Sequence, residues 1–335
     1  MSGVPGHVPL LATMRGRTIE CVHHGSIAVC GLHGDLVASV GDVQALNFAR
    51  SALKPLQALP FVEDDGPARF GFGSHEVALM CASHSGEAVH VRVVQRMLAR
   101  IGAREADLQC GSHPPLYYGA TGEPVPSQVR FGALHHNCSG KHAGFLAYCR
   151  LHGHRLAEYL APESALQVRI RNTVQQFVGT VPIECGIDGC SAPNYALPLA
   201  MLAHAYSRLA AGDGIALAAL RYAMVRHPDL VSGTARTDLA LAQAGDGDWI
   251  AKAGADGVQA IGVRSRRLGI AVRIADGNAR ALHTVTAEVL YQIGLLARPA
   301  DSPLAGMFRP PLTNYRGMKV GSLQPLFDLA PLAGR

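Results

Sequence analysis

The hydrophobic periodicity of this 335-residue chain changes along its length, and that order limits the folds available to it. Residues 19–30 and 36–40 are rich in apolar and β-branched side chains and flank a glycine-containing turn, which predicts a β-hairpin. Residues 141–245 have mainly helical periodicity. Three strand-like segments follow, at 249–253, 257–263 and 269–275. Strands from both chain ends can therefore pair into one antiparallel sheet beside a mainly helical region, which predicts a mixed α/β (α+β) fold.

We predict one compact unit over residues 1–335, made of two parts. Residues 18–60 and 246–330 form a part of mixed sheet and helix, and residues 61–245 form a mainly helical part. Residues 1–17 are expected to be a loose arm. Residues 110–137 are rich in Gly, Pro and His and have no long periodic segment, and a loop of this length is usually functional or a lid.

Helical periodicity also predicts where individual helices lie. One helix is expected to start near Ser51 and to end near Pro60. Pro55 falls inside its first turn or just after, and proline is tolerated better at a helix start than in the middle of a helix. Further helices are predicted at 75–82, 87–100, 141–152, 163–178, 195–211, 215–227, 237–243 and 278–296, followed by a short strand near 318–323.

The composition excludes several classes of protein. Hydrophobic residues make up 48% of the chain and charged residues 16%, which describes a filled globular core rather than a disordered chain. The formal charge is +5 and the arginines are scattered, so nothing indicates nucleic-acid binding. No apolar run reaches the ~18 residues of a membrane span. The first residues lack a secretory signal, so we expect eight reduced cysteines in a soluble, cytoplasmic protein.

Ser51 lies three residues before Lys54, and on a helix these two positions share a face. The helix N-terminus would stabilise negative charge that develops on the serine. A lysine held neutral by burial could take the serine proton and make a nucleophile. Because the chain has 17 serines and four lysines, such a spacing arises by chance about one time in five. The motif alone is therefore weak evidence for a catalytic pair, and further motifs must support it.

Lysine is scarce in this chain, which has 26 arginines and four lysines: Lys54, Lys141, Lys252 and Lys319. Arginine cannot lose its proton in a protein, whereas a buried lysine can. A retained lysine therefore favours a role that needs a neutral amine or a compact ammonium. Chance retention could explain any one of them, but three of the four lie in motifs rich in Ser, Cys and Gly.

Two further motifs accompany the first. Ser83 lies in a Ser-His-Ser segment after a short helix, and Lys252 lies in Ala-Lys-Ala-Gly on a predicted strand. In this order the three motifs match the layout of penicillin-recognising acyltransferases, in which a second Ser–Lys pair handles the leaving amine and backbone N–H groups stabilise the oxyanion. Ala253 stands where that layout usually has a hydroxyl residue, and Ser83 could equally be a helix-capping serine.

Cys138 and Cys190 lie in two glycine-containing motifs and leave two interpretations open. They could be zinc thiolates in a site with a third ligand and an open position. They could also be buried free cysteines, as is expected where no CxxC pair is present.

Other residues of these motifs are candidates for substrate binding. The segment Ser139, Gly140 and Lys141 could open a helix whose N-terminus binds a carboxylate. Asp188 could pair with a substrate ammonium, or it could simply form a turn. Arg50 is a further candidate partner for the substrate carboxylate.

Taken together, the motifs resemble the asparaginase II family, typified by the inducible, thermolabile Rhizobium enzyme. The resemblance extends over nearly the whole chain. Five motifs carry it in order: F-x-R-S-A-x-K-P-x-Q-A-L-P (48–60), C-A-S-H-S-G-E (81–87), H-N-C-S-G-K-H-A-G (136–144), G-I-D-G-C-S-A-P-N (186–194) and A-K-A-G-A-D-G-V (251–258). The resemblance implies a serine β-lactamase-like fold, as in penicillin-binding proteins, and hydrolysis of L-asparagine to L-aspartate and ammonia. It also implies a homodimer.

The resemblance further implies a set of site residues. Ser51–Lys54 and Ser83–Lys252 would form two Ser–Lys pairs. One zinc ion would be held by Cys138, Lys141 and Cys190, with water completing the site. A lysine ligand must be neutral, which fits a position occupied by lysine rather than arginine. Such a zinc could support substrate binding without taking part in bond cleavage.

The resulting hypothesis is an amidohydrolase. Ser51 attacks the side-chain amide with Lys54 as base, Ser83 and Lys252 relay protons to the departing ammonia, and water hydrolyses the aspartyl-enzyme. One alternative is another serine acyltransferase, such as a penicillin-binding hydrolase, for which a secreted location would be expected. A second alternative is a non-catalytic module that binds zinc or an amino acid, and two intact Ser/Lys pairs argue against it.

Overall fold

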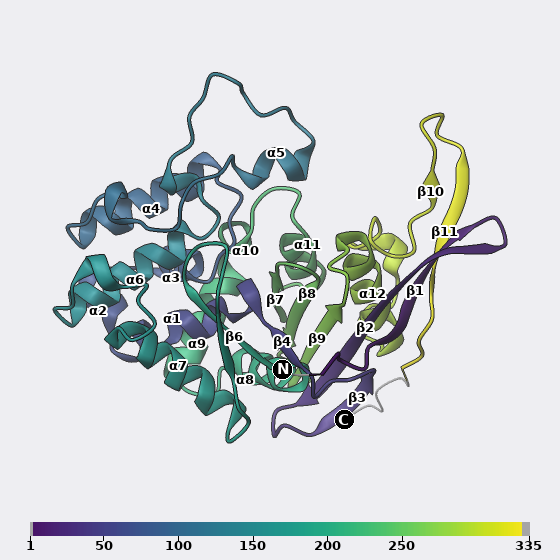
Figure 1. Cartoon of the computed structure of the whole chain (residues 1–335), viewed down its shortest axis with the longest axis horizontal. Coiled ribbons are helices and arrows are strands. Elements are labelled where there is room, and N and C mark those ends of the chain that lie inside the picture. Colours follow the sequence, from purple (N-terminus) through teal and green to yellow (C-terminus); the bar gives the residue numbers. More distant parts are fainter. Residues whose placement is uncertain (1–2, 330–335) are drawn as a thin grey trace.

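The computed structural model describes residues 3–329, and its largest feature is an eight-stranded antiparallel sheet (Figure 1). The strands follow the order β10–β11–β1–β2–β9–β8–β7, and β3 pairs with β2. Strands from the two chain ends are neighbours at β1–β11 and at β2–β9, which confirms the predicted sheet. The strand bounds are β1 Val8–Arg15, β2 Thr18–Gly31, β3 Leu36–Val40, β7 Trp249–Gly254, β8 Val258–Val263, β9 Leu268–Ile274, β10 Leu312–Thr313 and β11 Lys319–Pro325.

Helices dominate the chain between the first three strands and β7, which also agrees with the prediction. In chain order they are η1 Arg50–Leu53, α1 Lys54–Glu63, α2 Gly66–Phe70, α3 Ser74–Met80, α4 Ala88–Arg100, η2 Glu105–Asp107, α5 Leu116–Thr121, η3 Ala133–His135, α6 Ser139–Leu151, η4 Leu156–Glu158, α7 Ala165–Val178, α8 Leu199–Ala211, α9 Ile215–Arg226, α10 Pro228–Val231 and α11 Thr237–Ala244. After β9 come α12 Ala279–Gln292 and η5 Pro299–Asp301. None of the helices in the described part of the chain is long and apolar enough to cross a membrane.

Residues 8–15 form strand β1, so the prediction of a loose arm is wrong for them, and residues 1 and 2 lie outside the described residues. Residues Leu10 and Leu11 are fully buried, and β1 pairs with β2 on one side and β11 on the other. The apolar stretch at the start of β1 is short. It becomes a strand because residues more than 300 positions later supply its second partner.

A small sheet in the helical part was also not predicted. It has the order β4–β6–β5, formed by Leu46–Phe48, Pro193–Pro198 and Glu184–Ile187. The helix expected over 195–211 therefore begins only at Leu199, after the strand has ended at a proline. The helix expected from Ser51 begins as the 3₁₀ turn η1, and α1 starts at Lys54 with Pro55 in its first turn.

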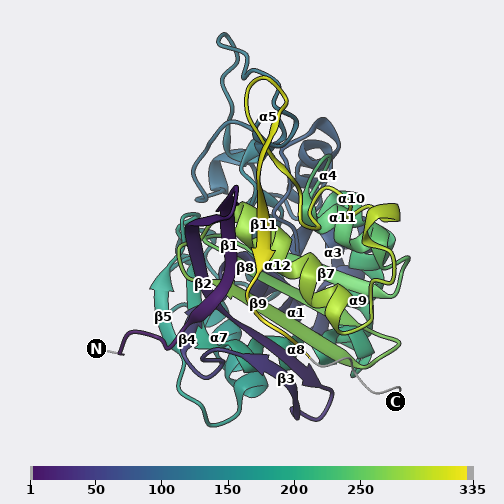
Figure 2. The ribbon, with the colours of Figure 1, turned by 90° about the vertical axis from the view of Figure 1, so that its right-hand side faces the viewer.

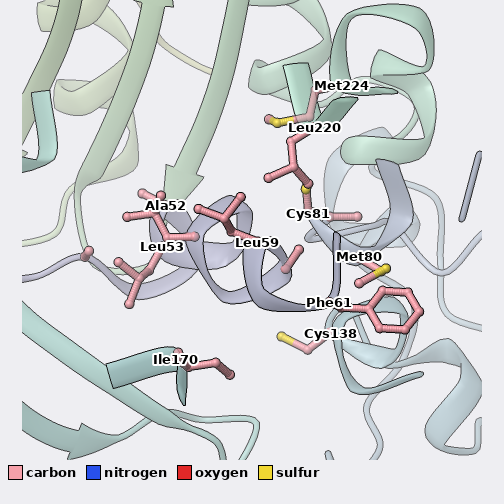
Figure 3. Close-up of a cluster of buried hydrophobic side chains, with 14 of the residues drawn as sticks. Ala52, Leu53, Leu59, Phe61, Met80, Cys81, Cys138, Ile170, Leu220 and Met224 are labelled. Carbon is pink, nitrogen blue, oxygen red and sulfur yellow. The ribbon is translucent and has the colours of Figure 1, made fainter. Parts of the chain in front are cut away.

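The sheet has one apolar cluster on each face. Alternate residues of β2 supply both: Ala28 and Cys30 join the cluster on the side of α8, and Ile27 and Val29 join the cluster on the side of α12 (Figure 2). Helix α8 lies very close to the sheet, because a side chain at Gly269 would collide with its backbone. Helix α1 lies within the first cluster, among residues that include Met80 and Cys138 (Figure 3).

Candidate active site

The turn that presents Ser51 is held in an uncommon conformation. Arg50 has a positive φ of 50°, which costs a residue with a side chain about 1–2 kcal/mol. The side chain of Asn194 holds it there: its Oδ1 accepts from the Arg50 N–H (3.0 Å), and its Nδ2 donates to the Arg50 carbonyl (3.0 Å). Ser51 follows, half-buried, in the turn that leads into α1. Strain of this kind is common where a backbone aims a functional side chain.

Lys54 is buried at the start of α1, and its amine faces oxygen atoms. Its Nζ donates to the hydroxyl of Ser83 (2.9 Å) and to the carbonyl of Ala82 (2.5 Å). Ser83 lies in the segment after α3, which is fixed because its N–H donates to the carbonyl of Val231 (3.0 Å). The structure therefore brings together Lys54 and Ser83, two residues that lie 29 positions apart in the chain.

Lys252 is fully buried on β7 and faces a carboxylate. Its Nζ is 3.0 Å from Oδ2 of Asp238, which lies in the first turn of α11. Asp238 also accepts from the N–H of Ala253 (2.8 Å) and from Nε2 of Gln259 (3.1 Å). This arrangement satisfies a carboxylate that is itself almost completely buried.

The pairing of serines and lysines differs from the pairing that the family resemblance implies. Among the side-chain hydrogen bonds of residues 3–329, Ser51 makes none with Lys54, and Ser83 makes none with Lys252. Lys54 binds Ser83 instead, and Lys252 binds Asp238. The reason is geometric: Lys54 points toward the end of α3, and Lys252 faces the carboxylate of Asp238, which comes from α11.

The charges of the buried ion pair follow from its surroundings. Burial alone would raise the pKa of Asp238, but Lys252 and the N–H of Ala253 lower it below its usual value, so the carboxylate is ionised. Burial, helped by the nearby Lys54, lowers the pKa of Lys252 in spite of Asp238. Lys252 is thus closer to losing its proton than an exposed lysine is.

A second buried cluster contains Cys138, Lys141 and Cys190. Cys138 immediately precedes α6, Lys141 lies in its first turn, and Cys190 lies in the turn between β5 and β6. The Lys141 Nζ is 3.1 Å from the Cys190 Sγ. A hydrogen bond with Cys190, together with Lys54 and Lys141, holds the pKa of the Cys138 thiol well below its usual value despite burial. Burial would lower the pKa of Lys141, but the two thiol groups raise it.

This cluster fits a soft divalent cation such as zinc. Two sulfur ligands, one stabilised as a thiolate, and a buried amine match the ligand types that zinc accepts. The adjacent His142 has its Nδ1 2.7 Å from the Tyr159 hydroxyl, while its buried Nε2 makes no hydrogen bond with an oxygen or nitrogen of residues 3–329. Within residues 3–329, no group of three or more His, Cys, Asp or Glu side chains is placed to hold a metal. Lys141 would therefore be an obligatory ligand, and it would release its proton on binding.

Arg50 and Asp188 lie together beside the Ser51 turn. The Arg50 Nε donates to Asp188 Oδ1 (2.9 Å), and its guanidinium also contacts Asp256. Burial would raise the pKa of Asp188, but Lys141 and Arg50 lower it, so the carboxylate is ionised. Both residues line a hollow of about 540 Å³, together with Asn47, Phe48 and Asn194. Asp256 and Arg273 line it as well, so two cations and two anions face a small charged ligand there.

Ser139 and Gly140 are placed less favourably for binding a substrate. Nδ1 of the buried His84 accepts from the N–H of Gly86, so its Nε2–H donates to Ser139 Oγ (2.8 Å). Ser139 in turn donates to the carbonyl of Leu134 (2.9 Å). Gly140 packs against the backbone of Leu79, where a side chain would collide. The Ser139 hydroxyl and the space around the Gly140 Cα are therefore taken up by contacts within the protein, and the helix N-terminus at these residues stays a predicted site for the substrate carboxylate.

The sequence matches the family model described as L-asparaginase II over residues 11–325. The chain belongs to the L-asparaginase II family. The match includes all the site residues described above, from Arg50 to Gln259. A comparison with proteins that have curated functional descriptions finds no significant match.

Several solved structures resemble this L-asparaginase II family member at low sequence identity. The native form of Mglu shares 16% identity over 83% of this chain and 66% of its own, with a TM-score of 0.38. A penicillin-binding protein homolog from Caulobacter crescentus shares 14% over 77% and 90% of the two chains (TM-score 0.39). A beta-lactamase from Mycobacterium bovis shares 14% over 79% and 93% (TM-score 0.34). The matched region thus spans slightly less than two thirds of Mglu.

Sequence reasoning about this family member missed three residues of the site. Asp238 lies in the first turn of a predicted helix, where an acidic residue is ordinarily explained by the helix dipole. Asn194 is the last residue of the motif at 186–194, yet nothing in its spacing indicates that its side chain binds the backbone of Arg50. His142 follows Lys141 directly, and its nearness to Cys190 arises only in the fold.

Proposed function

We propose that this protein hydrolyses L-asparagine to L-aspartate and ammonia through an acyl-enzyme on serine. The observation that carries the proposal is the buried contact between Lys54 and Ser83, since Lys54 follows the half-buried Ser51 by one turn and donates its N–H to the Ser51 carbonyl. A lysine with oxygen partners in a buried site is the base that such serine hydrolases need. Membership of the L-asparaginase II family supplies the substrate class.

In the proposed reaction, the Ser51 hydroxyl attacks the side-chain amide carbon of asparagine while Lys54 takes its proton. The C–N bond breaks, and the departing nitrogen receives a proton and leaves as ammonia. Ser83, which is hydrogen-bonded to Lys54, and Lys252 are the residues that deliver this proton to the nitrogen. Water then attacks the ester, releases aspartate and restores the Ser51 hydroxyl.

Arg50 and Asp188 are the proposed contacts for the charged end of the substrate. The guanidinium would bind the α-carboxylate, and the ionised Asp188 would bind the α-ammonium. In the free protein these two residues bind each other, so asparagine would replace one internal ion pair with two of its own. The neighbouring Asp256 would keep part of the Arg50 charge neutralised.

Cys138, Lys141 and Cys190 are proposed to hold one zinc ion per chain. When bound, it would supply a fixed positive charge beside Asp188 and Lys54 for substrate binding. His142 and Tyr159 would fix the surroundings of the sulfur ligands. Bond cleavage remains with the serine and lysine residues.

The test measures ammonia release by the purified protein from L-asparagine and L-glutamine, and the absorbance change of the chromogenic cephalosporin nitrocefin, each with and without a chelator. Asparagine should be hydrolysed fastest, and chelation should raise KM more than it lowers kcat. Hydrolysis of nitrocefin alone would favour a penicillin-type hydrolase. Binding of asparagine without ammonia release would favour a non-catalytic module.

We also propose a cytoplasmic homodimer. The homodimer comes from the resemblance to the family, and light scattering of the purified chain tests it through the mass in solution. All eight cysteines are free thiols, which agrees with a reducing compartment. A mass equal to one chain at micromolar concentration would contradict the homodimer.

A further inference from the structure

Asp238 is a buried carboxylate that neither the sequence motifs nor the proposed reaction uses. It binds Lys252 at 3.0 Å and receives two further hydrogen bonds, from the N–H of Ala253 and from the side chain of Gln259. Asp238 is 4% exposed and Lys252 is 0% exposed. A buried ion pair with this many donors is costly to assemble, and removing one partner leaves an uncompensated charge.

Among the charged groups around the pair, Asp238 is the anion closest to Lys252. Lys252 also faces Lys54 and Arg236, both cationic, and the thiol of Cys81. Asp238 additionally faces Tyr206 and His283. Two buried lysines thus share one carboxylate, and only Lys252 hydrogen-bonds to it.

We propose that Asp238 is the positioning residue of Lys252: it fixes the amine in place and keeps it protonated, so that Lys252 gives its proton to the departing nitrogen. The C–N bond of the amide breaks, the proton moves from the Lys252 Nζ to that nitrogen, and ammonia leaves. In the second step, Lys54 returns its proton to the Ser51 oxygen as the ester breaks, and the proton that water loses restores the Lys252 ammonium. Asp238 hydrogen-bonds to neither serine in the structure, so it acts through Lys252. This inference rests on the proposed function.

The scarcity of lysine allows a direct test of the pair that needs no activity. In the full chain labelled with ¹³C at lysine Cε, only four signals arise, and a Lys252→Arg variant assigns one of them. Asp238→Asn keeps the shape of the side chain and removes its charge, so the pKa of Lys252 should fall. In the wild type, the Asp238 carboxyl signal should shift at the same pH as Lys252. Independent titration of the two groups would overturn the pairing even if Asp238→Asn does not fold.

Glu288→Gln is the matched control, because Glu288 is another buried carboxylate whose partner is Arg309 (2.7 Å) on the far side of the sheet. It should leave the Lys252 titration and the kinetics unchanged. Asp238→Asn should lower kcat for asparagine by about 100-fold with KM within about threefold, and Asp238→Glu should recover part of the loss.

The outcomes separate this inference from the proposed function. An unchanged Lys252 titration in folded Asp238→Asn would overturn the inference, as would equal losses of kcat in Asp238→Asn and Glu288→Gln. A wild-type protein that releases no ammonia from asparagine contradicts the proposed function. In that case the lysine titration still decides whether Asp238 holds Lys252.

Discussion

Two buried regions of this molecule each contain a lysine, and they differ in the atoms that surround it. Lys252 faces a carboxylate and a backbone carbonyl, whereas Lys141 faces the sulfur atoms of Cys190 and Cys138. Burial and a neighbouring lysine lower the pKa of Lys252, while the two thiol groups raise the pKa of Lys141. The oxygen-lined region therefore suits proton transfer, and the sulfur-lined region suits metal binding.

Lys54 lies between these regions and connects them. Its amine donates to Ser83 in the oxygen-lined region, and it also helps lower the pKa of Cys138 in the sulfur-lined region. The two regions are thus adjacent parts of one site. Damage to the oxygen-lined region should mainly lower kcat, and damage to the sulfur-lined region should mainly raise KM.

The largest effect is expected from Lys54→Met, which removes the proposed base and keeps most of the side-chain volume. Activity should fall at least ~1,000-fold, since base and nucleophile act as a unit. Lys319→Met is the matched control, because Lys319 is exposed at the start of β11 and should be dispensable. Ammonia release at saturating asparagine checks both. Activity of Lys54→Met near that of the control would remove Lys54 from the mechanism.

The sulfur-lined region is tested by Cys190→Ser. Loss of one thiolate should lower zinc affinity and raise KM by about 10–100-fold while kcat changes less. Zinc content per chain, measured by mass spectrometry of the dialysed protein, gives the first readout. Cys149→Ser is the control, because Cys149 is a buried thiol outside both regions. Equal zinc content in the two variants would contradict the assignment of the ligand.

Asn194→Ala tests the turn that presents Ser51. The variant loses both hydrogen bonds that hold Arg50 at positive φ, and it should destabilise the fold by about 1–3 kcal/mol. We also expect a loss of kcat of about 10-fold, because the position of Ser51 relative to Lys54 relaxes. Urea unfolding and steady-state kinetics measure the two effects. A stability loss with unchanged kcat would mean that the strained turn does not position the nucleophile.

The smallest effect concerns buried histidines near the two regions. Burial holds the pKa of His84 well below 6.5 and lowers the pKa of His142 to about 4. The unfolded chain therefore binds more protons below pH 6.5, and the free energy of unfolding should fall as pH drops from 6.5 toward 4. Each group contributes a slope of up to about 1.4 kcal/mol per pH unit. His84→Gln, which keeps an acceptor and a donor, should flatten the slope, and the exposed His154→Gln should leave it unchanged.

Much of the fold follows from the sequence, because hydrophobic periodicity decides which segments are strands and which are helices. The pattern of 249–275 predicts three strands that the structure contains. Hydrophobic periodicity does not predict strand β1, because one of its two partners, β11, lies at the other end of the chain. The small sheet was missed for a similar reason: its strands β4 and β6 are separated by nearly 150 residues.

The site follows from the sequence less completely than the fold does. The motifs predict that Ser51, Lys54, Ser83 and Lys252 belong to one site, because residue types that carry this chemistry occur in a fixed order along the chain. The partner of each lysine depends on side-chain direction, which spacing does not encode. Asp238 and Asn194 illustrate this: each is one ordinary residue at an element boundary, and each acquires its contacts only when distant segments meet.

The account depends most on Ser51 as the residue that is acylated. Mass spectrometry of peptides from protein mixed with L-asparagine and quenched in acid within milliseconds tests this directly. We predict an aspartyl ester on the peptide that contains Ser51, and neither ester nor ammonia in folded Ser51→Ala. An ester on Ser83 instead, or wild-type ammonia release by Ser51→Ala, would contradict the account.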